Sequence, residues 1–187
     1  SSDVCSADLY YRAEDLKDIK HLQVCPGEFP WVRSKKDQDN SWYIRQDIDA
    51  SVSVGDANAR ALDVLNRGVD SLGFRLNASA EPARGDLEAL LKDLCISAIE
   101  LNFEAGGVAP VVVDFLKDKL GKEGMGAEEL KGGIDFNPLG ELNLSGGFSK
   151  DEQEAFEQSA RLIRDSEALK NFSVIEVNGA TLHNAGA

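Results

Sequence analysis

The chain has 187 residues, with an apolar fraction of 42% and a charged fraction of 28%, which is ordinary for a globular domain with one hydrophobic core. Its net charge of −13 argues against a nucleic-acid partner, because phosphate neutralisation needs clustered lysine and arginine. No apolar run approaches the roughly 18 residues of a membrane span, so no membrane partner is expected.

The cysteines and histidines of the chain show neither a disulfide framework nor a metal-ligand spacing. Cys5, Cys25 and Cys95 form no CxxC pair and are odd in number. No signal peptide opens the chain, so we expect free thiols and a cytoplasmic location. His21 and His183 lie far apart, and no metal site is predicted. The chain does not begin with Met and stops after a strand-like segment, so we expect a piece of a longer protein.

Residues 1–40 are predicted to be an irregular N-terminal extension. Pro26, Gly27 and Pro30 interrupt any regular element there, and the polar residues 35–40 are typical of an exposed turn. The exception is a short helix that we expect over residues 13–22.

From residue 41 onward the pattern alternates between strands and helices. Residues 42–48 alternate in polarity and are rich in β-formers, which predicts a strand. Asp56 is placed to cap a helix that Gly68 would end. Residues 71–76 predict a second strand, and residues 86–94 predict a helix with its leucines on one face.

The alternation continues to the end of the chain. Residues 96–103 predict a third strand, and Pro110 suits the first turn of a helix that runs to about residue 120. A short strand follows over residues 133–136. Ser149 and Glu152 form a capping box that would open a helix to about residue 169, and residues 172–177 predict the last strand.

Five strands that alternate with four helices indicate parallel βαβ units. Two α/β architectures fit: an open doubly wound sheet, or a (β/α)8 TIM barrel of which about the first five units lie in residues 41–187. A GxGxxG sequence after the first strand would favour the open sheet, but Gly55 stands alone there.

Ligands of parallel α/β proteins bind beyond the carboxyl ends of the strands, and polar residues gather there in this chain. Asp47 and Asp49 share one face of the first strand, so they are a candidate acid and base pair. The alternative is that they form a solvated strand edge. His183 lies just past the last strand and is a candidate general base, although a surface role fits a single histidine equally.

Several stretches resemble, in order and spacing, the beginning of the substrate barrel of methylmalonyl-CoA mutases. The family has a P-aromatic-x-R segment before an I-R-Q strand, and its barrel later has a strand followed by S-G-Y-H and E-A-G-A. The matching stretches here are residues 10–16, 26–33, 42–47, 57–74 and 174–187.

The resemblance implies a (β/α)8 barrel through which coenzyme A threads, capped by a separate cobalamin-binding domain. Family enzymes interconvert methylmalonyl-CoA and succinyl-CoA with adenosylcobalamin. Arg45 and Gln46 match the I-R-Q strand and Arg33 matches the P-aromatic-x-R segment, so these three residues are candidate contacts for a CoA ester. Structural roles for them are the alternative.

Four positions depart from the catalytic chain of that family. Asp47 stands where a substrate-facing tyrosine is expected, and Thr181 stands where the catalytic histidine is expected. Asp135 replaces a glutamine, and Ser145 replaces the arginine that would pair with the substrate carboxylate. These departures match the family's small subunit, which pairs with a catalytic large subunit.

The resemblance therefore predicts a component of an isomerase that is itself inactive. Adenosylcobalamin is expected in the holoenzyme but not on this chain, which lacks the family's Asp-x-His-x-x-Gly signature. Two alternatives stay open: an active mutase fragment that uses His183, and an unrelated α/β enzyme that uses Asp47 and Asp49. Five strands would leave two open barrel edges, so self-association through those edges is also predicted.

Overall fold

The computed structural model describes residues 12–34, 36, 41–77, 82–148, 151–184 and 186. The chain divides into two units, Ser1–Trp42 and Tyr43–Ala187. The described part of the first unit contains two short 3-10 helices, η1 (Ala13–Leu16) and η2 (Lys20–Gln23). The prediction of one helix over residues 13–22 was therefore wrong, because the backbone of Ile19 is extended and interrupts the helical turns.

The second unit contains a five-stranded parallel sheet. The strands follow one another in the order of the sequence, β1-β2-β3-β4-β5, without the reversal that marks a doubly wound nucleotide-binding sheet. The predicted parallel α/β sheet is confirmed, and closure into an eight-stranded barrel stays a prediction. The strands are β1 (Arg45–Asp49), β2 (Ser71–Arg75), β3 (Glu100–Glu104), β4 (Lys131–Ile134) and β5 (Phe172–Ser173).

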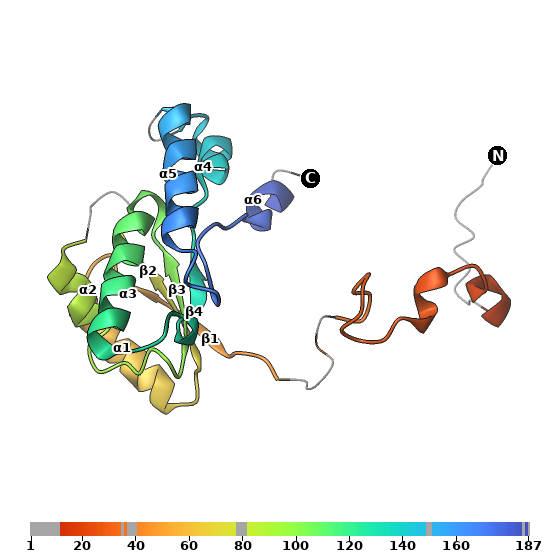
Figure 1. Ribbon diagram of the computed structural model, residues 1–187, viewed down its shortest axis with the longest axis horizontal. Coiled ribbons are helices and arrows are strands. Elements are labelled where there is room, and N and C mark those ends of the chain that lie inside the picture. Colours follow the sequence, from red (N-terminus) through yellow and green to blue (C-terminus); the bar gives the residue numbers. More distant parts are fainter. Residues whose placement is uncertain are drawn as a thin grey trace. The chain divides into compact units, whose positions relative to one another are not determined.

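Helices connect each strand to the next, as Figure 1 shows. One α-helix follows each of the first three strands, and two α-helices lie between β4 and β5. A final short helix follows β5 (Figure 1). The helices are α1 (Val54–Asn66), α2 (Arg84–Leu90), α3 (Ala109–Glu123), α4 (Pro138–Ser145), α5 (Glu152–Asp165) and α6 (Gly179–Asn184).

Two of the predicted helix starts were wrong by a few residues. The hydroxyl of Ser53, not Asp56, caps α1: it accepts a hydrogen bond from the backbone N–H of Asp56 at 3.3 Å. Asp151 caps α5, and its carboxylate accepts from the N–H groups of Gln153 and Glu154. The predicted cap Ser149 lies outside the described residues.

The two faces of the sheet differ in polarity because side chains alternate along each strand. Leu72 and Phe74 of β2 and Leu101 and Phe103 of β3 are buried, and they share one hydrophobic core with the apolar faces of α1, α2 and α3. The rings of Phe74 and Phe103 lie 5.9 Å apart. These helices therefore cover one face of the sheet, and the residues of opposite parity form the other face.

Candidate functional site

The face of the sheet opposite the buried core is polar, and the strand register arranges its residues in three rows. We call this surface the polar face. The row at the amino ends contains Arg45, Ser71, Glu100 and Lys131; the middle row contains Asp47, Gly73, Asn102, Gly133 and Ser173; and the row at the carboxyl ends contains Asp49, Arg75 and Glu104, with Asp135 directly after β4.

A cavity of about 370 Å³ opens on the polar face. Arg45 of β1, Asn102 and Glu104 of β3 and Ser173 of β5 line it, together with Glu176 from the segment after β5. The middle row leaves this space at Gly133, which has no side chain, and at Ser173, whose side chain is small. Of the three predicted CoA-ester contacts, Arg45 lines the cavity.

An ion pair lies next to this cavity. The Nε atom of Arg45 donates to Oδ1 of Asp47 at 2.7 Å, and both side chains are partly exposed. The pair occupies the space above Gly73, since a Cβ atom built on that glycine would lie 1.9 Å from Asp47 Oδ1 and 2.8 Å from Arg45 Nη2. Gly73 is thus the residue that allows the ion pair to lie flat on the sheet.

A second ion pair lies in the row at the carboxyl ends. The Nε atom of Arg75 donates to Oε2 of Glu104 at 2.6 Å, and this hydrogen bond raises the pKa of Arg75. Asp49 accepts hydrogen bonds from the hydroxyl of Ser51 at 2.6 Å and from its N–H at 2.9 Å, and these bonds lower the pKa of Asp49. Asp47 and Asp49 share one face as predicted, and each has its own local partner, Arg45 for Asp47 and Ser51 for Asp49.

Asp135 connects the ends of β3 and β4. Its Oδ1 atom accepts from the N–H of Ala105 at 2.6 Å and from the N–H of Gly106 at 3.1 Å. Burial raises the pKa of Asp135, although these two hydrogen bonds oppose the shift, and the nearby carboxylate of Glu104 raises it further. The carboxylate therefore holds the loop between β3 and α3.

A half-buried polar network lies at the amino end of the polar face, and sequence reasoning missed most of it. The hydroxyl of Ser71 donates to Oε2 of Glu100 at 2.5 Å. The Nδ2 atom of Asn102 donates to Oγ of Ser71 and to Oε2 of Glu100, each at 3.2 Å. The sequence signal for this network was the alternation of polar residues at Glu100, Asn102 and Glu104, which lie on one face of β3. It was obscured because Ile96 and Ile99, which are buried but precede the strand, moved the predicted strand toward the N-terminus.

The other predicted site residues lie elsewhere. Gln46 is adjacent to Arg45 in β1, so its side chain lies on the opposite face, where it donates to the carbonyl of Asp47 at 2.9 Å. Arg33 belongs to the first unit, and its guanidinium donates to the carbonyl oxygens of Leu22 and Val24. Arg45 and Gln46 therefore lie on opposite faces of β1. The guanidinium of Arg33 is held by backbone carbonyl groups of its own unit.

The predicted positions near the C-terminus lie on short helices. The hydroxyl of Ser145, at the end of α4, donates to the carbonyl of Glu141 at 2.8 Å. Positions 181 and 183 both lie in α6, a helix that the sequence did not predict. His183 is exposed and does not line the cavity of the polar face. The side chain of Thr181 lies outside the described part of the chain.

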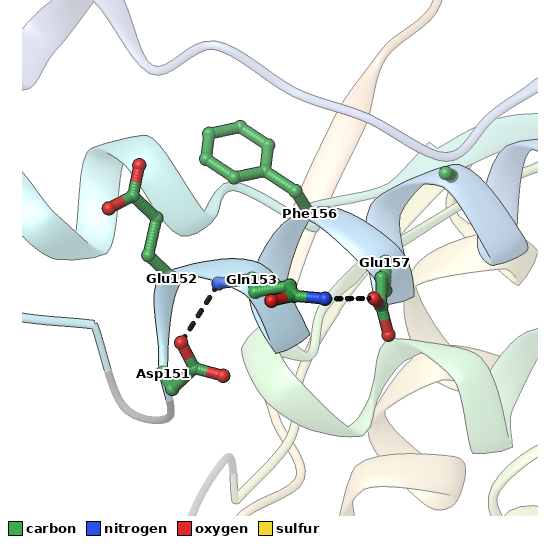
Figure 2. Close-up of a pocket in the computed structure, with 6 residues that line it drawn as sticks. Asp151, Glu152, Gln153, Phe156 and Glu157 are labelled. Atoms are coloured by element: carbon green, nitrogen blue, oxygen red, sulfur yellow. Dashed lines mark hydrogen bonds between the residues drawn. The ribbon is translucent and has the colours of Figure 1, made fainter.

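A second, shallow hollow of about 500 Å³ lies on the first turns of α5. Figure 2 shows Glu152 and Phe156 projecting from the helix, with Asp151 bonded to the backbone of Gln153 and Gln153 bonded to Glu157. The ring of Phe156 packs edge-on against Phe148 at 6.2 Å. Asp151 is used there as the helix cap, and the hollow lies on a single helix with an exposed aromatic ring, so it is a weaker candidate for chemistry.

Neither a metal centre nor a membrane-spanning helix is found among the described residues. No group of three or more histidine, cysteine, aspartate and glutamate side chains is arranged there to hold a metal ion. No helix there is long and apolar enough to cross a membrane. Cys25 and Cys95 are exposed free thiols, and Cys5 lies outside the described residues.

Comparison with known proteins tests the resemblance that the motifs indicated. No protein-family model matches the chain. The chain is 34% identical over 183 residues to the methylmalonyl-CoA mutase small subunit of Porphyromonas gingivalis (strain ATCC BAA-308 / W83). The predicted resemblance to this small subunit is confirmed. The match covers 95% of the chain but 28% of the relative, so the chain corresponds to one region of that methylmalonyl-CoA mutase subunit.

Proposed function

We propose that this chain is part of the non-catalytic small subunit of an adenosylcobalamin-dependent methylmalonyl-CoA mutase, which isomerises methylmalonyl-CoA and succinyl-CoA in the cytoplasm. In this proposal the five parallel strands form the first part of a (β/α)8 barrel. The catalytic residues belong to a large subunit with which this chain pairs. The similarity to a small subunit over 95% of the chain supports the family, and the sequential strand order is compatible with the barrel.

The observation that carries the non-catalytic role is the ion pair of Arg45 and Asp47. Position 47 is where the resemblance places a substrate-facing tyrosine, and here a carboxylate lies on the polar face with its charge directed to Arg45 at 2.7 Å. A carboxylate cannot supply an aromatic wall, and its charge repels a substrate carboxylate. Arg45, the candidate CoA-ester contact at this cavity, is therefore already engaged.

The residues of this chain do not fit a cobalamin ligand set. The chain contains two histidines, and neither stands in an Asp-x-His-x-x-Gly sequence. His21 lies in η2 and His183 in α6, and both are exposed. We therefore assign cobalamin to other parts of the holoenzyme.

The geometry favours neither alternative function. A catalytic fragment that uses His183 needs this imidazole at the strand ends, but His183 is exposed and does not line the cavity. An enzyme that uses Asp47 and Asp49 as acid and base needs one carboxyl that holds a proton near neutral pH. Asp47 pairs with Arg45, and the hydrogen bonds from Ser51 lower the pKa of Asp49.

The test is a mutase assay of the full-length protein, alone and after mixing with a catalytic large subunit, with adenosylcobalamin present in both. We expect no turnover alone, a stable complex by size-exclusion chromatography, and turnover by the complex. His183→Ala in this chain should leave the turnover of the complex unchanged. Turnover by the protein alone, abolished by His183→Ala, would overturn the non-catalytic role.

A further inference from the structure

Each arginine of the polar face is bound to a carboxylate. Arg45 pairs with Asp47 at 2.7 Å, and Arg75 pairs with Glu104 at 2.6 Å. The three cations of the described rows stand beside five carboxylates, so the face is acidic overall. The cations are Arg45, Arg75 and Lys131, and the carboxylates are Asp47, Asp49, Glu100, Glu104 and Asp135.

We infer that Asp47 sets the charge preference of the cavity: it holds Arg45 against Gly73 and so makes the cavity reject anionic ligands. This inference deepens the proposed function, on which it rests, by naming the positioning residue that withholds the barrel's arginine. The class of ligand that the cavity would take is neutral or cationic, with hydrogen-bonding groups for Asn102 and Ser173.

The first reason to expect that the cavity rejects anions is the charge around Arg45. Recognition of a phosphate or carboxylate relies on a guanidinium that can donate two parallel hydrogen bonds. The Nε atom of Arg45 already donates to Asp47, so the edge of the guanidinium that contains Nε cannot donate to a ligand. Glu104 and Glu176 line the same cavity; Glu104 is paired with Arg75, and Glu176 adds negative charge where an anion would lie.

The second reason is the position in which Asp47 holds the side chain of Arg45. The Oδ1 atom of Asp47 and the Nη2 atom of Arg45 fill the volume that a Cβ of Gly73 would occupy. Asp47 thus draws the guanidinium down onto the middle of the sheet. With a small, neutral residue at position 47, the guanidinium of Arg45 would be free to turn into the cavity, at whose wall Arg45 already lies.

The experiment is a double-mutant cycle at Arg45 and Asp47 in the full-length protein, with inorganic pyrophosphate as the probe in calorimetric titrations. Asp47→Asn removes the charge but keeps the volume, so pyrophosphate affinity should rise about fivefold to tenfold. Asp47→Ala also opens the space above Gly73 and should raise the affinity at least as much. Arg45→Gln should change little in the wild type and should abolish the gain in the Asp47→Asn background.

Two further variants separate this role from general electrostatics. Asp49→Asn removes one negative charge from the same strand and face without touching the ion pair, so its gain should stay within about twofold. Asp47→Glu keeps the negative charge, so its affinity for pyrophosphate should stay as low as that of the wild type. Circular dichroism should show that each variant folds, as expected for partly exposed side chains.

An equal gain from Asp47→Asn and Asp49→Asn would overturn the inference, because the effect would then come from net charge alone. It would also be overturned if Arg45→Gln weakened binding equally in both backgrounds, since Arg45 would then already be available to anions. Turnover by the protein alone overturns the proposed function instead. The titrations need no mutase activity, so the two failures are distinguishable.

Discussion

At the scale of single residues, Gly132 shows where the backbone tolerates no side chain. Its φ of +125° lies in the region that favours glycine, and an added Cβ would lie 1.8 Å from the carbonyl oxygen of Leu101 in the neighbouring strand. We expect Gly132→Ala to lower the free energy of unfolding by about 2–4 kcal/mol, measured by urea denaturation.

Gly121 provides a matched control for this substitution. It lies near the end of α3, is exposed, and has no atom within 4 Å of an added Cβ. Gly121→Ala should therefore raise the free energy of unfolding by about 0.5–1 kcal/mol, because alanine is the better helix former. Equal effects of the two substitutions would contradict the steric argument at Gly132.

Asp135 gives stability a dependence on pH. Burial raises its pKa above the ordinary 3.8, so the native state retains a proton that the unfolded state releases. Its contribution to the free energy of unfolding is then largest below 3.8 and is lost as pH rises through the folded pKa. Asp135→Asn removes this dependence, so the stability of the variant relative to wild type should increase as pH rises from below 3.8 through the folded pKa.

The same carboxylate also has a structural role that a second variant tests. Asp135→Ala leaves the N–H groups of Ala105 and Gly106 without their acceptor, so it should cost about 1–3 kcal/mol at neutral pH. Asp135→Asn retains an acceptor oxygen and should cost less. Urea denaturation across the pH range measures both variants, and a pH-independent difference between Asp135→Asn and wild type would refute the role assigned to burial.

At the scale of elements, the N-terminus of α5 depends on one side chain. Asp151 accepts from the N–H groups of Gln153 at 3.0 Å and Glu154 at 3.3 Å, and its charge also favours the positive end of the helix. Asp151→Ala should lower the free energy of unfolding by about 0.5–2 kcal/mol, whereas Asp151→Asn should lose less. Thermal unfolding followed by circular dichroism measures both, and identical losses would show that the hydrogen bonds contribute little.

The sequence predicted the elements with strong hydrophobic patterns and missed those that depend on tertiary context. The five strands, α1, α2, α3 and α5 were found because buried side chains repeat at strand or helix spacing. The helix α4 was missed because it has no buried residue to create such a pattern. Likewise, β5 is only two residues long, since pairing with β4 ends although the β-forming sequence continues to Val177.

The candidate site was predicted less completely than the fold. That Asp47 and Asp49 share a face followed from alternation along one strand. Their separate partners did not follow, because the ion pair with Arg45 requires the space above Gly73 on the adjacent strand. The cavity itself depends on which strands are neighbours, and that information lies in the sheet and not in any local pattern.

At the scale of the whole molecule, the sheet order has one physical consequence for association. A parallel sheet whose strands follow the chain order places β1 at one edge and β5 at the other. Such edges present unpaired N–H and C=O groups, which attract other strands. An exposed apolar residue lies next to each edge strand. Ile44, directly before β1, is 54% exposed, and Ile175, shortly after β5, is 39% exposed.

We therefore expect the isolated chain to self-associate through these edges, and multi-angle light scattering should give an average mass above the 20.2 kDa of one chain. Ile44→Lys and Ile175→Lys together should shift the chain toward the monomer, because edge lysines oppose strand addition. Val52→Lys is the control, since Val52 is 91% exposed but lies in the turn after β1. A monodisperse wild-type monomer would refute edge association, and equal effects of Val52→Lys would place the contact elsewhere.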